Sequence, residues 1–165
     1  MILYAVLALV AVQRLAELAY ARRNGARLIA DGGVEHGSGH YPLFVLLHGA
    51  WLAAIAVLVP ADASPSWPLL GLYLALQAWR IWAIRSLGVY WTTRIIAVPG
   101  ARLVRTGPYR LMRHPNYAGV AIEIPLLPLA FGAWRLALSF GLANLLLLAW
   151  RIREEERWLA PRRAL

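Results

Sequence analysis

The chain contains no cysteine and no lysine, and only eight of its 165 residues are acidic. The lack of cysteine excludes disulfides, thiolate metal ligands and a thiol redox switch. Because all seventeen basic side chains are arginine, the net charge of +9 cannot be removed by deprotonation at any ordinary pH. We also find no internal repeat and no low-complexity tract. The class of protein must therefore be inferred from its apolar segments and its arginines.

Hydrophobic residues make up 61% of the sequence and the mean hydropathy is +0.56, which is too apolar for a soluble globule of this size. A membrane-spanning helix needs about 20 mostly apolar residues. We therefore expect an all-α polytopic integral membrane protein with about five transmembrane helices. The expected spans are 1–19, 41–59, 68–87, 117–134 and 136–150. The last two are almost contiguous, which predicts an antiparallel C-terminal hairpin.

Arginines are concentrated after the first, third and fifth of these spans. The positive-inside rule places such segments on the cytoplasmic side, so we expect the N-terminus outside and the C-terminus in the cytoplasm. This rule also explains the arginines without a nucleic-acid partner, and none is expected. The first span lacks a preceding basic region and contains polar residues, which favours a retained helix over a cleaved signal peptide.

Charged residues inside apolar spans are costly and indicate either a partner or a function. Gln13, Arg14 and Glu17 share one face of the first span, while Arg80 lies in the third span and Glu123 in the fourth. An Arg80 to Glu123 pair would neutralise both charges. The pattern leaves open whether these charges hold helices together or line a substrate pocket.

Two of the four histidines, His36 and His40, have the spacing of a helical metal pair. The glycines in the 31–40 segment favour a loop instead, so no metal site is expected. His40 and His48 lie at the mouth of the second span. We expect both to face a cavity and to contact the substrate.

Residues 107–119 have the features of a ligand-binding loop. Pro115 disfavours helical geometry at His114, and Asn116 is predicted to cap a helix that begins near Tyr117. The free amides of that helix would suit a carboxylate. The alternative is an interfacial loop with belt aromatics and snorkelling arginines.

Further along, Arg151 and Glu155 are one helical turn apart beyond the last span. As a structural feature this is a solvated i,i+4 ion pair. As a functional feature, Glu155 would bind the ribose or ammonium group of a nucleoside cofactor, and Arg151 would hold an anionic acceptor.

Three patterns together resemble the isoprenylcysteine carboxyl methyltransferase family over roughly residues 90–160. They are Gly107-x-Tyr109, Arg113-His114-Pro115-x-Tyr117-x-Gly119 and Arg151-x-x-x-Glu155-Glu156-x-x-Leu159. The resemblance implies a single membrane methyltransferase domain over residues 1–165, with an N-terminal three-helix part (1–88) and a cytoplasmic cofactor-binding region (89–160). The implied cofactor is S-adenosylmethionine. Ala101 departs from the family pattern, because many relatives have histidine there, and Arg94 stands near the position of a glutamine.

Carried over residue by residue, the resemblance assigns cofactor contacts and two catalytic positions, Arg151 and Glu155, with Arg151 facing the acceptor. The implied cofactor-binding residues are Leu103, Val104, Tyr109, His114, Pro115, Asn116, Tyr117 and Glu155.

The segment from Val34 to His48 resembles a small bacterial branch of this family that is associated with type III polyketide synthases. Members of that branch are thought to O-methylate lipophilic alkylpyrones. The expected partners are therefore membrane lipid and a lipophilic acceptor, prenylcysteine-like or alkylpyrone-like, methylated on a carboxylate or acidic enol. The sequence does not choose between these acceptors and does not define the oligomeric state.

Two other functions compete with this interpretation. Membrane sterol and steroid reductases end in a similar Arg-His-Pro-x-Tyr-x-Gly segment and use NADPH, although they are generally larger. A non-enzymatic membrane scaffold would use the intramembrane charges only to hold helices together.

Overall fold

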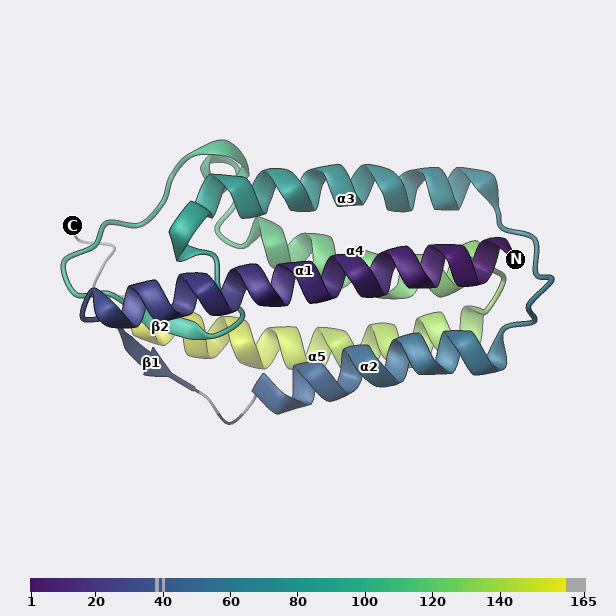
Figure 1. Cartoon of the computed structure of the whole chain (residues 1–165), viewed down its shortest axis with the longest axis horizontal. Coiled ribbons are helices and arrows are strands. Elements are labelled where there is room, and N and C mark those ends of the chain that lie inside the picture. Colours follow the sequence, from purple (N-terminus) through teal and green to yellow (C-terminus); the bar gives the residue numbers. More distant parts are fainter. Residues whose placement is uncertain (38, 40, 160–165) are drawn as a thin grey trace.

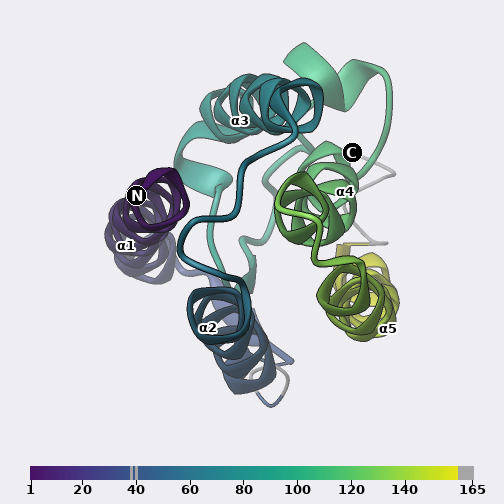
Figure 2. The same ribbon diagram turned by 90° about the vertical axis from the view of Figure 1, so that its right-hand side faces the viewer.

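The computed structural model describes residues 1–37, 39 and 41–159. Its five helices run side by side along the long axis (Figures 1 and 2), which confirms the expected helical membrane fold. They are α1 (Ile2–Ala30), α2 (Tyr41–Leu58), α3 (Trp67–Leu87), α4 (Pro115–Ala130) and α5 (Trp134–Leu159). Among the described residues, α1, α2 and α5 are long and apolar enough to cross a membrane by length and composition. The count of about five spanning helices is thus approximate, with α3 and α4 completing the bundle.

The first helix is longer than predicted, because it continues to Ala30 instead of ending near residue 19. Its extension packs against the chain that follows α3, where the Asn24 amide donates to the carbonyls of Gly88 at 3.1 Å and Trp91 at 2.8 Å. Asn24 is fully buried there. Tertiary contacts of this kind stabilise a helix beyond its apolar stretch.

The predicted C-terminal hairpin is present, with α4 and α5 joined at Gly132, whose φ of +75° suits the turn. Helix α5 then continues without a break through residues 151–156. Its last turns contain the acidic residues that follow the apolar part of the helix. They lie at the same end of the bundle as the start of α4 (Figure 1).

A small antiparallel sheet was not anticipated. Strand β1 (Val34–His36) pairs with β2 (Ile95–Ala97), His36 lying opposite Ile95. The prediction of a loop throughout 31–40 was therefore wrong at these positions, because a pairing between segments this far apart in sequence leaves no local signal. Two 3₁₀ helices, η2 (Gly88–Tyr90) and η3 (Gly107–Arg110), complete the long connection between α3 and α4.

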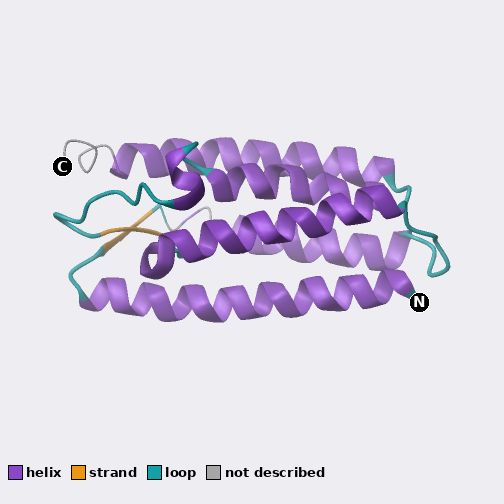
Figure 3. Ribbon diagram, turned by 90° about the horizontal axis from the view of Figure 1, so that it is seen from above, coloured by secondary structure: helices purple, strands orange, loops and turns teal. Residues whose placement is uncertain are grey.

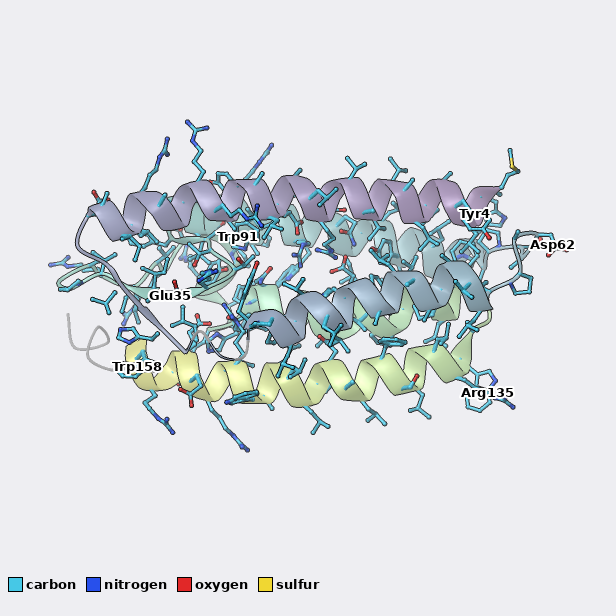
Figure 4. All side chains as sticks on the ribbon, turned by 60° about the horizontal axis from the view of Figure 1, so that its bottom comes forward. Tyr4, Glu35, Asp62, Trp91, Arg135 and Trp158 are labelled. Carbon is cyan, nitrogen blue, oxygen red and sulfur yellow. The ribbon has the colours of Figure 1, made fainter. Side chains whose placement is uncertain are left out.

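Both strands and the long connection lie at one end of the bundle (Figure 3). We call this the arginine-rich end, because it carries the arginines in the last turns of α1, in the connection after α3 and in the last turns of α5. Glu35, Trp91 and Trp158 mark it in Figure 4, whereas Tyr4, Asp62 and Arg135 mark the opposite end.

The bundle interior changes in character along its length. Toward the opposite end it is apolar, with Leu3, Ile55 and Leu127 fully buried. One polar link crosses this core, where the Trp51 indole donates to the Ile124 carbonyl at 3.0 Å. This core fixes the relative positions of α1, α2 and α4.

Between that core and the arginine-rich end lies a layer of buried charge. Arg80 donates through Nε and Nη2 to the two carboxylate oxygens of Glu17, each at 2.7 Å, and its Nη1 lies 3.6 Å from Glu123. Arg14 contacts both Glu17 and Glu123. The Arg80 to Glu123 pair considered from the sequence therefore forms, within one neutral network that joins α1, α3 and α4.

Candidate functional site

A cleft of about 750 Å³ opens at the arginine-rich end. This volume lies within the range of small-molecule sites, about 300 to 1,000 Å³. Its walls come from the connection after α3, the start of α4 and the last turns of α5. Seven of the eight residues expected to contact the cofactor line it: Leu103, Val104, Tyr109, His114, Asn116, Tyr117 and Glu155. The eighth, Pro115, is buried as the first residue of α4.

The start of α4 forms one wall of the cleft. The helix begins at Pro115, with His114 at the cap position, so the prediction that Asn116 caps a helix starting near Tyr117 was wrong. Proline fits the first helical position because its fixed φ is already helical and no amide bond is lost there. Among the described residues, no side chain caps this end. Its first amides therefore remain available to an anionic group.

A tryptophan from α3 holds this start in place. The Trp79 indole donates to the Pro115 carbonyl at 2.9 Å. A Cβ added at Gly119 would lie 3.3 Å from the same ring. Glycine at 119 therefore allows α4 to approach α3 closely.

One hydroxyl connects α4 to α5. The Tyr117 hydroxyl donates to Glu155 and accepts from Nε of Arg151 at 2.7 Å. Arg151 is buried, with its guanidinium carbon 5.8 Å from the Tyr117 ring centroid and 5.7 Å from that of Phe44 on α2. The Tyr117 hydroxyl thus bridges Arg151 and Glu155, and Arg151 lies where α2, α4 and α5 come together.

Glu156 makes a second connection between the loop and α5. His114 Nε2 lies 2.9 Å from a Glu156 oxygen and donates to it, because a carboxylate only accepts. Arg113 approaches the other oxygen at 3.5 Å, and the His114 ring stacks on Tyr117 with centroids 5.4 Å apart. Sequence reasoning gave Glu156 no role. Its place in the same acidic run as Glu155 was the available signal.

Two side-chain atoms of cleft-lining residues, the Tyr109 hydroxyl oxygen and Asn116 Oδ1, are buried without a hydrogen-bond partner among the described residues. Burial, and then the charge of Glu155, raises the pKa of Tyr109, so its hydroxyl remains a donor. An unpaired buried polar group costs about 1 to 3 kcal/mol. The cleft therefore suits a ligand that offers both hydrogen-bond acceptors and donors, as a nucleoside does.

The cleft also has more positive than negative charge. Two glutamates face five arginines, which are Arg94, Arg105, Arg110, Arg113 and Arg151. Arg94 is bonded to Glu35 at 2.7 and 3.0 Å and lies 5.0 Å above the Tyr41 ring. Sequence reasoning noted Arg94 only as a departure from the family pattern and assigned no site role to Arg105, Arg110 or strand β2.

The expected substrate contacts of the histidines stay predictions. His40 lies outside the described residues. His48 does not line the cleft; its Nδ1 donates to the Phe44 carbonyl at 2.8 Å, one turn earlier on α2. Its ring lies 6.4 Å from the ring of Phe44, which in turn contacts Arg151.

Two bacterial proteins have similar sequences. A protein of Bacillus subtilis (strain 168) named "Uncharacterized protein YpbQ" is 42% identical over 157 residues, which is 93% of this chain and 94% of that protein. An "Uncharacterized protein" of Haemophilus influenzae (strain ATCC 51907 / DSM 11121 / KW20 / Rd) is 29% identical over 150 residues, or 87% and 86% of the two chains. No solved structure matches this chain significantly.

The sequence model of the Isoprenylcysteine carboxyl methyltransferase (ICMT) family matches residues 69–161. This range includes most of α3, all three walls of the cleft and the α4–α5 hairpin. The chain is therefore an integral membrane protein that belongs to the isoprenylcysteine carboxyl methyltransferase family, a family of membrane methyltransferases.

Proposed function

We propose that this protein is an S-adenosylmethionine-dependent O-methyltransferase that acts on a carboxylate or acidic enol of a lipophilic acceptor in the membrane. The observation that carries the proposal is the convergence of the loop before α4 and the acidic end of α5 on one cleft of nucleoside size. Membership of a methyltransferase family supports the reaction type.

The cleft offers a partner for each polar part of the donor. The open amides at the start of α4 would bind the carboxylate of its methionine tail. Glu155 would bind the ammonium group or the ribose. The unpaired atoms of Tyr109 and Asn116 would meet polar atoms of the nucleoside.

Bound there, the donor would supply a sulfonium methyl group to the acceptor oxyanion, and sulfur would keep the electron pair of the broken carbon–sulfur bond. Two opposite charges disappear in this step, so a dry site of low dielectric favours the transition state over the reactants. A carboxylate or acidic enol is already ionised at neutral pH. The protein therefore needs mainly to align the reacting groups.

Arg151 is the residue best suited to hold the acceptor anion. It lines the cleft and is buried, with the rings of Tyr117 and Phe44 close to its guanidinium. Its bond to the Tyr117 hydroxyl fixes the guanidinium beside Glu155. The aromatic rings would exclude water from the acceptor oxygen.

We place the arginine-rich end on the cytoplasmic side of a bacterial inner membrane. In that orientation the polar donor reaches the cleft from water, while a prenylcysteine-like or alkylpyrone-like acceptor reaches it from the lipid. This division of access gives a physical reason for a membrane location.

The five arginines of the cleft also suit the phosphates of NADPH, so a membrane reductase is the second candidate. Thermal stability of the purified protein separates the two functions. We expect saturable stabilisation by S-adenosylhomocysteine, loss of that stabilisation in Glu155→Gln, and its retention in the neighbouring control Glu154→Gln. Saturable stabilisation by NADPH alone would contradict the proposal. Transfer of a labelled methyl group to an alkylpyrone or a prenylcysteine analogue then identifies the acceptor.

A further inference from the structure

The η3 turn, which we define as residues 105–113, projects sideways from the bundle beyond α3 (Figures 1 and 2). It is attached to the last turns of that helix. The Thr106 hydroxyl contacts the Ser86 carbonyl at 3.4 Å, and Gly107 packs against Ser86 and Trp82. Trp82 is 46% exposed on the outer surface of α3. An exposed tryptophan at the end of a membrane helix is typical of the headgroup region, so the η3 turn lies at that level.

The outer surface of this turn combines apolar and cationic side chains. Leu111 is 72% exposed and Met112 is 42% exposed, between two arginines. The side chain of Arg113 is itself 73% exposed. Apolar side chains flanked by arginines are costly in water but suit a boundary between acyl chains and phosphates.

The inner surface of the same turn belongs to the cleft, because Arg105, Arg110 and Arg113 also line it. S-adenosylmethionine carries a net positive charge, from one sulfonium and one ammonium against one carboxylate. A cleft with more arginines than glutamates would repel such a ligand. Anionic groups bound on the outer surface of the turn would reduce this repulsion.

We propose that anionic phospholipid headgroups bind the η3 turn, with phosphates at Arg105, Arg110 and Arg113 and with Leu111 and Met112 in the acyl boundary. The bound lipid lowers the positive potential of the cleft and raises its affinity for a cationic methyl donor. The statement about lipid binding is independent of the proposed function, whereas the statement about the donor rests on it.

The position of the turn is tested by labelling, which the absence of cysteine makes specific. A fluorophore is attached to Leu111→Cys in nanodiscs and, as a control, to Ile29→Cys, which is 47% exposed at the end of α1. We expect lipids with a nitroxide near the headgroup to quench the label at 111 much more than the label at 29. Quenching at 111 by a water-soluble agent alone would overturn the proposal.

Lipid binding is tested by thermal stability in neutral detergent, without any cofactor. We expect phosphatidylglycerol, but not phosphatidylcholine, to stabilise the protein. The effect should be lost in the triple variant Arg105→Gln/Arg110→Gln/Arg113→Gln and retained in Arg23→Gln/Arg27→Gln/Arg153→Gln, which removes the same charge from exposed sites of the same end. An equal response of both variants would overturn the proposal, as would an equal effect of inorganic phosphate.

The effect on the donor is tested by comparing two analogues in nanodiscs. Sinefungin keeps a cationic centre in place of the sulfonium, whereas S-adenosylhomocysteine does not. Replacing phosphatidylcholine by phosphatidylglycerol should strengthen sinefungin binding by about threefold relative to S-adenosylhomocysteine at low salt. Equal strengthening of both ligands would overturn the electrostatic mechanism. If neither ligand bound, the proposed function would fail, while the two lipid experiments would still decide whether the turn binds phospholipid.

Discussion

Arg151 Nε and the Tyr117 hydroxyl lie 2.7 Å apart, and that hydroxyl in turn donates to Glu155. One neutral oxygen therefore connects a buried cation to a carboxylate and joins α4 to α5. Because a direct i,i+4 ion pair along α5 would not involve α4, the sequence spacing alone does not reveal this link. The link therefore holds the start of α4 and the last turns of α5, which both line the cleft, in a fixed relative position.

Replacing Tyr117 by phenylalanine removes this link with little change in side-chain volume. Hydrogen bonds to charged groups contribute about 1.5 to 3 kcal/mol each. We therefore expect S-adenosylhomocysteine to bind at least tenfold more weakly, as measured by calorimetry on the purified protein. Tyr4→Phe is the matched control, because its hydroxyl contacts the Ala56 carbonyl at the opposite end of the bundle. An unchanged affinity in Tyr117→Phe would argue against the site.

The loop-to-helix contact between His114 and Glu156 gives a second prediction. Glu156→Gln keeps an acceptor oxygen but loses the charge that holds both His114 and Arg113. We expect weaker binding of S-adenosylhomocysteine by about three- to tenfold, because the loop is held less firmly. Hydrogen exchange should show faster exchange in residues 107–114 of this variant. Identical exchange in variant and parent would contradict this role.

The buried charge layer predicts a large effect on stability. Glu123 is 2% exposed and faces both Arg14 and Arg80. Removing one partner of a buried ion pair costs about 3 to 5 kcal/mol, so Glu123→Ala should lower the free energy of unfolding by that order. This free energy is measured by denaturation in mixed micelles.

The control for that experiment is Glu35→Ala, which breaks the pair with Arg94. The side chains of this pair are 28% and 48% exposed. Exposed pairs contribute about 0 to 1 kcal/mol, so the control should change stability little. Comparable losses in both variants would contradict the buried network.

Alanine substitutions at two glycines distinguish the effect of backbone strain from the effect of a steric clash. Gly107 has φ +55°, and a Cβ there would lie 2.1 Å from the Ser86 hydroxyl oxygen. Gly100 has φ +72° but open space around it. Alanine at either position adds about 1 to 2 kcal/mol of backbone strain, but only Gly107→Ala should also displace the η3 turn. We expect a lower melting temperature and weaker S-adenosylhomocysteine binding in Gly107→Ala than in Gly100→Ala.

The sequence was sufficient to predict most elements that depend on local pattern. Runs of apolar residues gave the helical membrane fold and the α4–α5 hairpin. Hydropathy underestimated α1, because the helix beyond residue 19 is held by Asn24 and its contacts with Gly88 and Trp91. The predicted start of α4 was misplaced. Pro115 and Asn116 are both typical of a helix start, and only Pro115 takes that role, as the first residue of the helix.

By itself, the sequence determined that this chain needs a bilayer, carries positive charge that pH does not remove, and places motif residues beside its last two helices. Only the tertiary structure decided that the motifs face one cleft, that Tyr117 joins Arg151 to Glu155, and that β2 and several arginines complete the walls. The physical reason is separation along the chain. Apolar periodicity acts within a helix, whereas the pairing of His36 with Ile95 or of Arg14 with Glu123 depends on how the helices pack.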